Sequence, residues 1–229
     1  MKITATTILE TTTSTNTYVK THLDTMVPGT LVRAIAQTDG KGRRGTTWHA
    51  KPGKNLTFSF LLEGDIAASR RVLMASVLAV VDALDGIGVC ASVKLPNDVY
   101  IDHHKVAGIL LETTVQRGKA FIVCGVGINV NELAPDRYDP IASSLAVKTK
   151  KTHALGVLLQ AFTRAFNDQI NETTLFQAFK TITLRRQHVV MHHQNHYRLI
   201  DFTPDFTCQI ETNGDTKHVP CERLTFTLK

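Results

Sequence analysis

A short loop early in the chain combines three glycines with three cations, in the order Gly40-Lys41-Gly42-Arg43-Arg44-Gly45. Glycine allows a backbone to approach a ligand closely, and cationic side chains can neutralise a carboxylate and a phosphate together. Such a loop suits chemistry that must bring two anions into contact. Taken alone, however, it is more typical of an exposed basic hairpin or of a nucleic-acid patch.

Two phosphate-binding motifs overlap this loop, and neither fits the residues around it. The loop matches the dinucleotide fingerprint G-x-G-x-x-G after a predicted strand, but the fingerprint requires a helix to begin there. Residues 46–53 include Trp48, Pro52 and Gly53 and have no helical pattern. A P-loop would require lysine at the position of Thr46. The loop is therefore predicted to bind its ligand outside both of these folds.

Four other segments carry polar residues that suit a ligand site. They are Thr13-Ser14-Thr15-Asn16, Lys94-Leu95-Pro96-Asn97-Asp98, the segment 105–112 (KVAGILLE) and the segment 125–131 (GVGINVN). The first lies just before a predicted helix, the second ends a predicted strand, the third begins a strand and the fourth follows another. Each segment alone also fits an ordinary cap or turn, so only their combination carries weight.

Hydrophobic periodicity predicts the elements that must position these segments. Period-two apolar runs predict strands over 6–10, 31–37, 55–62, 91–94, 99–101, 106–114 and 121–126. Helical spacing predicts helices over 16–23, 69–84 and about 152–181. From about residue 185 the pattern changes to short strands with a turn signal at 213–215. We therefore predict an α+β catalytic domain over 1–183 and a small β domain over 184–229.

Composition narrows the class of protein. A chain of 229 residues with 43% hydrophobic content can bury one large core and a small one. It has neither an apolar run of roughly 18 residues nor a signal peptide, so we expect a cytoplasmic protein. The net charge of +6 suits polyphosphates, nucleic acid or an acidic protein partner.

The cysteines and histidines give no metal or disulfide signal. Cys90, Cys124, Cys208 and Cys221 are far apart in sequence, so we expect buried reduced thiols. Four histidines cluster near the C-terminus at 188, 192, 193 and 196. Adjacent residues on a strand point to opposite faces, so we interpret this cluster as solvated or hydrogen-bonded histidines, and no protein metal ligand is assigned.

In this order, the five motifs with Gln37 and Trp48 resemble the catalytic domain of bacterial biotin–protein ligases over about residues 10–131. The resemblance implies the mixed sheet of the class II aminoacyl-tRNA synthetase and biotin ligase fold, with helices mainly on one side. It also implies a small SH3-like β-barrel at the C-terminus, which agrees with the short strands predicted after residue 185.

The resemblance also implies a binding site for biotin. The implied biotin-binding residues are Ser14, Thr15, Asn16, Gln37, Lys41, Gly42, Arg43 and Lys105. A ureido head group offers donors and acceptors, which suits the hydroxyls and amides among these residues, and the cations suit the biotin carboxylate. Ser14 also fits a plain helix N-cap, and Lys105 a solvated hairpin lysine.

For the nucleotide, the resemblance implies Arg44, Trp48, Asn97 and Asn129. Trp48 could stack on adenine or anchor the loop, and Asn129 could equally be a turn asparagine. The implied catalytic residues are Arg43, Lys105 and Asp98, with Asp98 accepting the proton of the attacking lysine amine. Asn97 would position phosphate or a magnesium-bound water.

The implied reaction has two steps and uses biotin, ATP and Mg²⁺. Biotin and ATP form biotinyl-adenylate, and a lysine of a biotin carboxyl carrier protein domain then displaces AMP. A mobile loop over residues 40–47 would order over the ligands and protect the adenylate from water. The first predicted strand begins near residue 6, so we expect no preceding helix-turn-helix domain, no DNA partner and no repressor function of the kind that some family members have. We expect no membrane partner, because no apolar run is long enough to cross a bilayer, and a homodimer is possible. A lipoate–protein ligase of the same fold and a basic nucleic-acid-binding module are the alternatives.

Several residues depart from the usual family pattern. Lys41 stands where arginine is usual, Leu95 where tryptophan is usual, and Thr46 where another basic residue is frequent. Lysine lacks the bidentate geometry of arginine, so a side-chain contact at position 41 would weaken while a backbone contact would survive. In the C-terminal segment, Cys221-Glu222 replaces a glycine-acid pair.

Overall fold

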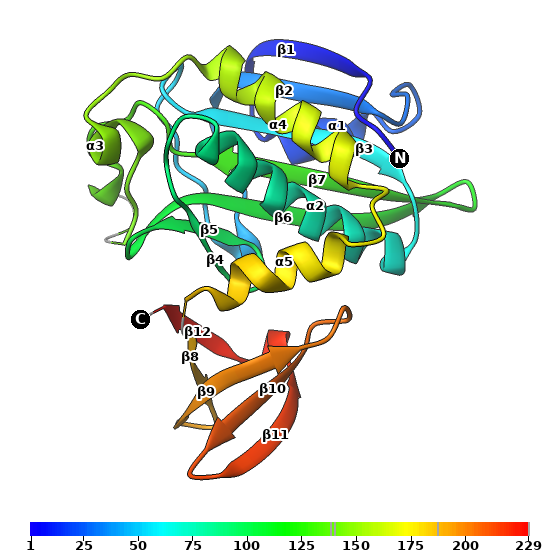
Figure 1. Ribbon diagram of the computed structural model, residues 1–229. Coiled ribbons are helices and arrows are strands. Elements are labelled where there is room, and N and C mark those ends of the chain that lie inside the picture. The colour runs from blue at the N-terminus through cyan, green and yellow to red at the C-terminus, as the bar shows by residue number, and fades with distance from the viewer. Residues whose placement is uncertain (138, 140, 187, 229) are drawn as a thin grey trace.

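The computed structural model describes residues 1–137, 139, 141–186 and 188–228. It contains a seven-stranded mixed sheet followed by a five-stranded antiparallel sheet (Figure 1). The last helix before the second sheet ends at Leu184 and the first strand after it begins at His188. The division into domains at 183/184 stays a prediction, and residues 187 and 229 of the expected C-terminal domain lie outside the described residues.

The first sheet contains every strand predicted before residue 130. Its strands are β1 (Ala5–Thr12), β2 (Thr30–Gln37), β3 (Leu56–Glu63), β4 (Ser92–Lys94), β5 (Asp98–Ile101), β6 (His104–Gln116) and β7 (Lys119–Ile128). They lie in the order β1-β2-β3-β7-β6-β5-β4. β1 and β2 run parallel and the other recorded neighbours are antiparallel, which confirms the predicted mixed sheet.

Helices cover the two faces of this sheet unequally. The described helices are α1 (Thr15–Thr21), α2 (Ile66–Asp85), α3 (Leu145–Thr149), α4 (Leu155–Gln169) and α5 (Leu175–Leu184). The face that carries Phe58 and Phe60 of β3 packs against Phe162 of α4, with α2 in the same layer (Figure 1). Leu61 points the other way and packs with Val19 of α1. No helix in the described part of the chain is both long and apolar enough to cross a bilayer.

The helical segment predicted over about 152–181 is found as two helices, α4 and α5. The break spans the segment Asn171-Glu172-Thr173-Thr174, in which three of the four residues have low helix propensity. The guanidinium of Arg71 donates hydrogen bonds to the carbonyls of Ile170 and Glu172 at this break. These bonds satisfy carbonyl groups that have no partner where a helix ends.

The C-terminal strands form one antiparallel sheet beneath the first. They are β8 (His188–His192), β9 (Asn195–Phe202), β10 (Thr207–Thr212), β11 (Asp215–Pro220) and β12 (Thr225–Leu228), in the order β11-β10-β9-β8-β12 (Figure 1). Asn213 and Gly214 both have positive φ, 50° and 87°, and form the predicted two-residue turn. This arrangement is compatible with the SH3-like fold that the resemblance implies.

Two cysteine expectations are wrong. Cys208 and Cys221 form a disulfide, with their Cα atoms 5.9 Å apart, and Cys90 is exposed. Pairing of β10 with β11 places Cys208 opposite Val219, so residues separated by 13 positions in sequence become neighbours. Sequence spacing alone cannot show this proximity. Cys124 is a buried free thiol, as expected.

The histidine expectation is partly confirmed. His188 is buried, and its Nε2 lies 3.0 Å from the carbonyl oxygen of Val93, so it is a hydrogen-bonded histidine of the interior. The argument that His192 and His193 point to opposite faces is wrong, because β8 ends at His192 and their ring centroids lie 4.1 Å apart. The described residues contain no group of three or more histidine, cysteine or acidic side chains placed to hold a metal ion.

Candidate active site

A cavity of about 830 Å³ opens on the α1 face of the first sheet. All thirteen residues that sequence analysis assigned to ligand binding or catalysis line it, although they come from segments between residues 14 and 129. This volume is within the usual range of small-molecule sites, roughly 300–1,000 Å³. Among the described lining residues, five are Lys or Arg and two are Asp, so the cavity favours anions.

The glycine- and arginine-rich loop forms a small hairpin beside this cavity. Lys41 pairs with Thr47, Gly42 N donates to Thr46 O at 2.7 Å, and a 3₁₀ turn over Arg43–Gly45 closes the hairpin. Arg44 has φ 53° and Gly45 has φ 78°, a left-handed pair for which glycine is well suited. No helix follows this loop, which confirms that the loop is not a dinucleotide-binding fingerprint.

One end of the cavity is lined by a polar network from α1 and β2. Gln37 Oε1 accepts hydrogen bonds from the backbone N of Thr15 at 2.7 Å and from Thr15 Oγ1 at 3.1 Å. Ser14, Thr15 and Asn16 are each less than 5% exposed. Ser14 occupies the N-cap position of α1 without a side-chain cap bond, so its hydroxyl does not have the ordinary capping role.

Glycines of β6 and β7 form the floor on which aromatic and amide side chains lie. A Cβ at Gly127 would meet the indole of Trp48 at 2.4 Å, and one at Gly108 would meet the same ring at 3.3 Å. Trp48 is half-buried, its Nε1 is buried without a hydrogen-bond partner, and Lys105 Nζ lies 5.7 Å from the ring centroid. An indole held in this way is anchored by the sheet, and its Nε1–H can still donate to a ligand.

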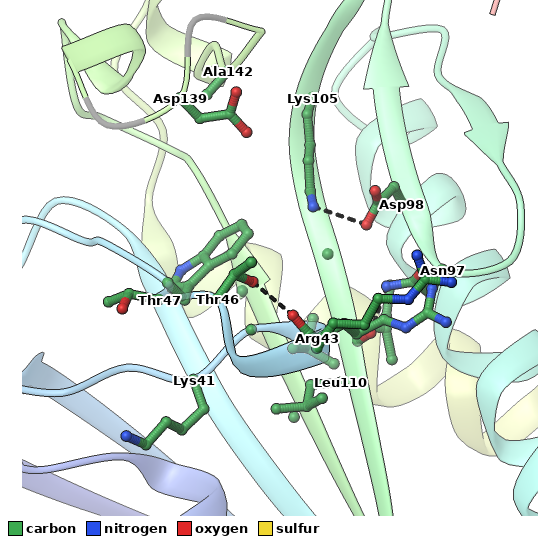
Figure 2. A pocket seen from close by; sticks show the side chains of 18 of the residues that line it. Lys41, Arg43, Thr46, Thr47, Asn97, Asp98, Lys105, Leu110, Asp139 and Ala142 are labelled. Atoms are coloured by element: carbon green, nitrogen blue, oxygen red, sulfur yellow. Dashed lines mark hydrogen bonds and ion pairs between the residues drawn. The ribbon is translucent and has the colours of Figure 1, made fainter. Parts of the chain in front are cut away.

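The cations and the motif after β4 meet at the corner of the cavity shown in Figure 2. Arg43 Nη1 donates to Asn97 Oδ1 at 2.5 Å, and Asn97 Nδ2 donates to the carbonyl oxygen of Ile109 at 2.8 Å. Lys105 Nζ forms an ion pair with Asp98 Oδ1 at 2.9 Å (Figure 2). Two positive side chains thus converge on one carboxylate and one amide.

Burial changes the ionisation of this corner. Desolvation lowers the pKa of Arg43, and the nearby Asp98 carboxylate partly offsets the effect. Desolvation also lowers the pKa of Lys94, and the Asp98 carboxylate again partly offsets this shift. Desolvation raises the pKa of Tyr100. Lys94 Nζ lies 3.4 Å from the Tyr100 hydroxyl. The positive charges are therefore partly desolvated, which strengthens their attraction for an anionic ligand.

Two of the assigned cations have partners that were not expected. Lys41 pairs at the surface with Asp39, so its backbone faces the cavity more directly than its ammonium group, which points away in Figure 2. Arg44 Nη2 donates to the carbonyl oxygen of Glu222 at 2.9 Å, which links the loop to the C-terminal sheet. The disulfide residue Cys221 also lines the cavity.

Sequence reasoning missed several residues in and behind the site. Ser59 on β3 lies behind the described lining, is fully buried, and its Oγ lies 2.6 Å from Thr15 Oγ1 and 2.5 Å from Asn16 Oδ1. A signal was available, because Thr57 and Ser59 alternate with Phe58 and Phe60 and so predict a polar face on that strand. The cavity lining includes Asp139, and no local motif marks this residue. It also includes four residues near the C-terminus that no local motif marks: Cys221, Leu224, Thr225 and Phe226.

Comparison with known proteins shows to which family this chain belongs. Residues 8–129, more than half of the chain, match the family described as the biotin/lipoate A/B protein ligase family. The chain belongs to this family. The matched segment contains all thirteen assigned residues and stops before α3, so the family match concerns the first sheet with α1 and α2.

Curated members of the biotin/lipoate ligase family include similar proteins from several bacteria. The chain is 33% identical over 151 residues to the bifunctional ligase/repressor BirA of Bacillus subtilis, covering 61% of this chain and 46% of that protein. It is 33% identical over 126 residues to the biotin–[acetyl-CoA-carboxylase] ligase of Mycobacterium tuberculosis, covering 52% and 46%. The chain thus spans less than half the length of these curated relatives.

A solved family structure matches nearly the whole chain. The biotin protein ligase from Aquifex aeolicus, solved in complex with biotin and ATP, has a TM-score of 0.82. The match covers 98% of this chain and 99% of that one at 23% identity. At this identity the match shows the fold, including the small C-terminal sheet.

Proposed function

We propose that this protein activates biotin with ATP and transfers it through biotinyl-5′-AMP to a lysine of a biotin carboxyl carrier domain. One observation carries the proposal: thirteen residues predicted for biotin, ATP or catalysis, distant in sequence, line a single cavity. The cavity combines a buried polar end with a cationic corner. Those two environments suit a neutral head group and a carboxylate facing a phosphate.

We assign the polar end to the biotin ring. Ser14, Thr15, Asn16 and Gln37 offer hydroxyl and amide groups, and a ureido ring needs both donors and acceptors. The backbone at Lys41 and Gly42 would lie along the tail of biotin. This assignment places the carboxylate at the other end of the ligand, toward Arg43 and Lys105.

The cationic corner would stabilise charge in the activation step. The biotin carboxylate attacks the α-phosphate of ATP and displaces pyrophosphate, and two anions approach only where positive charge cancels their repulsion. Arg43 is fixed by Asn97, and Lys105 lies beside Asp98, so both cations are held before the ligands arrive. Trp48 and Asn129 would contact the nucleotide, and Arg44 its phosphates.

Asp98 has the second catalytic role in this proposal. The acceptor lysine attacks the adenylate only as a neutral amine, so a group at the corner must accept its proton. Asp98 is the carboxylate nearest to Lys105, and its side chain is 19% exposed. Displacement of Lys105 by the ligand carboxylate would leave Asp98 able to orient the incoming amine.

Magnesium fits this cavity as a companion of the nucleotide. Mg²⁺ is usually held by one or two carboxylates together with substrate phosphates. Asp98 and Asp139 are the acidic residues in the described lining, and Asn97 adds an amide oxygen. Mg²⁺ would neutralise phosphate charge during activation.

We propose the carrier domain of acetyl-CoA carboxylase as the protein partner, since curated relatives are named biotin–[acetyl-CoA-carboxylase] ligases. A homodimer is compatible with the proposal and is not required by the site, which one chain supplies. Transfer of lipoate by the same chemistry is the second candidate, because the family description covers lipoate ligases.

Comparing the two acids tests the proposal. The protein is incubated with ATP, Mg²⁺ and either biotin or lipoate, and pyrophosphate release and the acyl-adenylate are measured. We expect adenylate with biotin and little with lipoate, because a dithiolane ring cannot form the hydrogen bonds that the polar end of the cavity offers. Adenylate with lipoate alone would overturn the substrate assignment. Salt-sensitive binding of mixed DNA, with no adenylate from either acid, would favour the nucleic-acid-binding alternative.

A further inference from the structure

Glu112 ends the segment 105–112, and the reaction proposed above gives it no part. Its carboxylate accepts a hydrogen bond on each oxygen. Oε2 accepts from Asn16 Nδ2 at 2.9 Å, and Oε1 accepts from Lys20 Nζ at 2.7 Å. The Lys20 pair is partly exposed, where ion pairs contribute little, whereas Asn16 is only 3% exposed. The bond to Asn16 is therefore the more consequential one.

The side chain of Asn16 is enclosed on its other sides. Its Oδ1 lies 2.5 Å from Ser59 Oγ, and Ser59 is fully buried on β3. A Cβ at Gly125 would lie 2.1 Å from the same Oδ1, so the amide rests on the backbone of β7. Because Asn16 is enclosed in this way, its amide has two possible orientations. Either its oxygen or its nitrogen faces Ser59.

Glu112 determines this orientation. An ionised carboxylate only accepts hydrogen bonds, so the amide nitrogen of Asn16 must face Glu112 and its oxygen must face Ser59. The Ser59 hydroxyl has one proton to donate. Ser59 Oγ also lies 2.6 Å from Thr15 Oγ1, and Thr15 Oγ1 lies 3.1 Å from Gln37 Oε1. One charged group on β6 thus fixes the orientation of the Asn16 amide and directs the single Ser59 proton toward Asn16 Oδ1.

We propose that Glu112 is a positioning residue that sets the pattern of donors and acceptors presented to the ligand head group. The inference rests on the proposed function, because a ureido ring is the head group that would recognise this pattern. Glu112 itself is outside the described lining of the cavity and acts through Asn16. Charge-assisted hydrogen bonds are roughly twice as strong as neutral ones, so the carboxylate holds Asn16 better than an amide could.

Glu112→Gln tests this role, because it keeps the shape of the side chain and removes its charge. A glutamine amide can donate as well as accept, so both orientations of Asn16 become available and only one binds biotin. We expect the Kd of biotin, measured by calorimetry without ATP, to rise about three- to tenfold. The KM for biotin should rise in parallel, while kcat and the KM for ATP stay within about twofold.

Two further variants complete the test. Glu112→Ala removes the acceptor of Asn16 Nδ2 and should raise the Kd of biotin more than Glu112→Gln does. Lys20→Met removes the other partner of Glu112, leaves the Asn16 bond intact and should change the Kd by less than about twofold. Melting temperatures of all three variants equal to that of the unmodified protein would show that the fold is retained.

The outcomes separate this role from the proposed function. If the unmodified protein binds biotin and both Glu112 variants bind it equally well, the positioning role is wrong. It is also wrong if biotin affinity, ATP affinity, kcat and melting temperature all fall together, which would indicate a general structural role. If the unmodified protein binds no biotin, the proposed function fails and the role of Glu112 fails with it.

Discussion

At the scale of single residues, the site depends on side chains held in place before any ligand binds. Arg43 is fixed by Asn97, which is fixed in turn by the carbonyl oxygen of Ile109. Such preorganised charge needs little rearrangement when negative charge develops. The residue types of Arg43 and Asn97 were predictable from their motifs. Their hydrogen bond was not, because the two residues lie 54 positions apart.

Replacing Arg43 tests the charge that this corner supplies. Arg43→Ala should lower kcat/KM for adenylate formation about 10²–10³-fold, the usual loss for one charge-stabilising donor. Arg43→Lys should restore part of it, because lysine keeps the charge without the two-pronged geometry. Pyrophosphate release measures both variants. Arg198→Ala, at an exposed ion pair of the C-terminal sheet, is the control. Arg43→Ala activity equal to that of the control would contradict the assigned role.

Gly127 tests the position of Trp48, the single tryptophan of the chain. A methyl group at Gly127 would meet the indole at 2.4 Å, so the ring would have to move. Gly127→Ala should shift the fluorescence of Trp48 and raise the KM for ATP more than the KM for biotin. Gly156→Ala is the matched control, because its Cβ would enter open space on α4 and leave both values unchanged. An unchanged KM for ATP in Gly127→Ala would contradict the assignment of Trp48 to the nucleotide site.

At the scale of elements, the loop over residues 40–47 is the part best suited to move. It is a short hairpin, joined by the bond from Arg44 to the carbonyl oxygen of Glu222, which lies in the 3₁₀ turn between β11 and β12. Arg44 and the residues after it up to Thr47 are exposed. Loops with few buried contacts open easily and are common among segments that close over ligands.

Limited proteolysis tests ordering of this loop. Trypsin cleaves after lysine and arginine, and the loop contains Lys41, Arg43 and Arg44. Biotin with ATP should slow cleavage at these sites, while cleavage at exposed Arg117 in the β6–β7 turn stays constant as the internal control. Equal cleavage rates at the loop with and without the ligands would show that the loop does not close over them.

Much of this arrangement of elements is predictable from sequence, because strands and long helices follow local periodicity. Each strand predicted for the first sheet overlaps an observed one, and the two-residue turn at Asn213–Gly214 is confirmed. The break between α4 and α5 and the short α3 were missed, since the hydrogen bonds from Arg71 and the cap at Ser144 are tertiary or very local features. The link from Glu112 to Asn16 spans 96 positions and has no sequence signature.

At the scale of the whole molecule, the C-terminal sheet is docked onto the first sheet through His188. Its Nε2 lies 3.0 Å from the carbonyl oxygen of Val93 on β4, next to the motif that carries Asn97 and Asp98. Desolvation lowers the pKa of His188 below its ordinary value of 6.5, hydrogen bonds to the backbone partly offset this, and Lys94 lowers it slightly further.

This burial makes stability dependent on pH. Below pH 6.5 the unfolded chain binds a proton at this histidine that the folded chain resists, so the free energy of unfolding falls as pH drops toward the lowered pKa. Above pH 6.5 this loss is absent. Urea unfolding between about pH 8 and about pH 5 should show a weaker acid-induced loss in His188→Gln than in the unmodified protein. Parallel pH profiles would contradict a buried neutral His188.

The most direct test of the central claim is the mass of a biotin carboxyl carrier domain after incubation with this protein, biotin, ATP and Mg²⁺. The account predicts that one lysine gains one biotinyl group, with release of AMP and pyrophosphate, and that Arg43→Ala greatly slows the gain. An unmodified carrier under conditions in which a known biotin ligase modifies it would contradict the proposed function of the cavity.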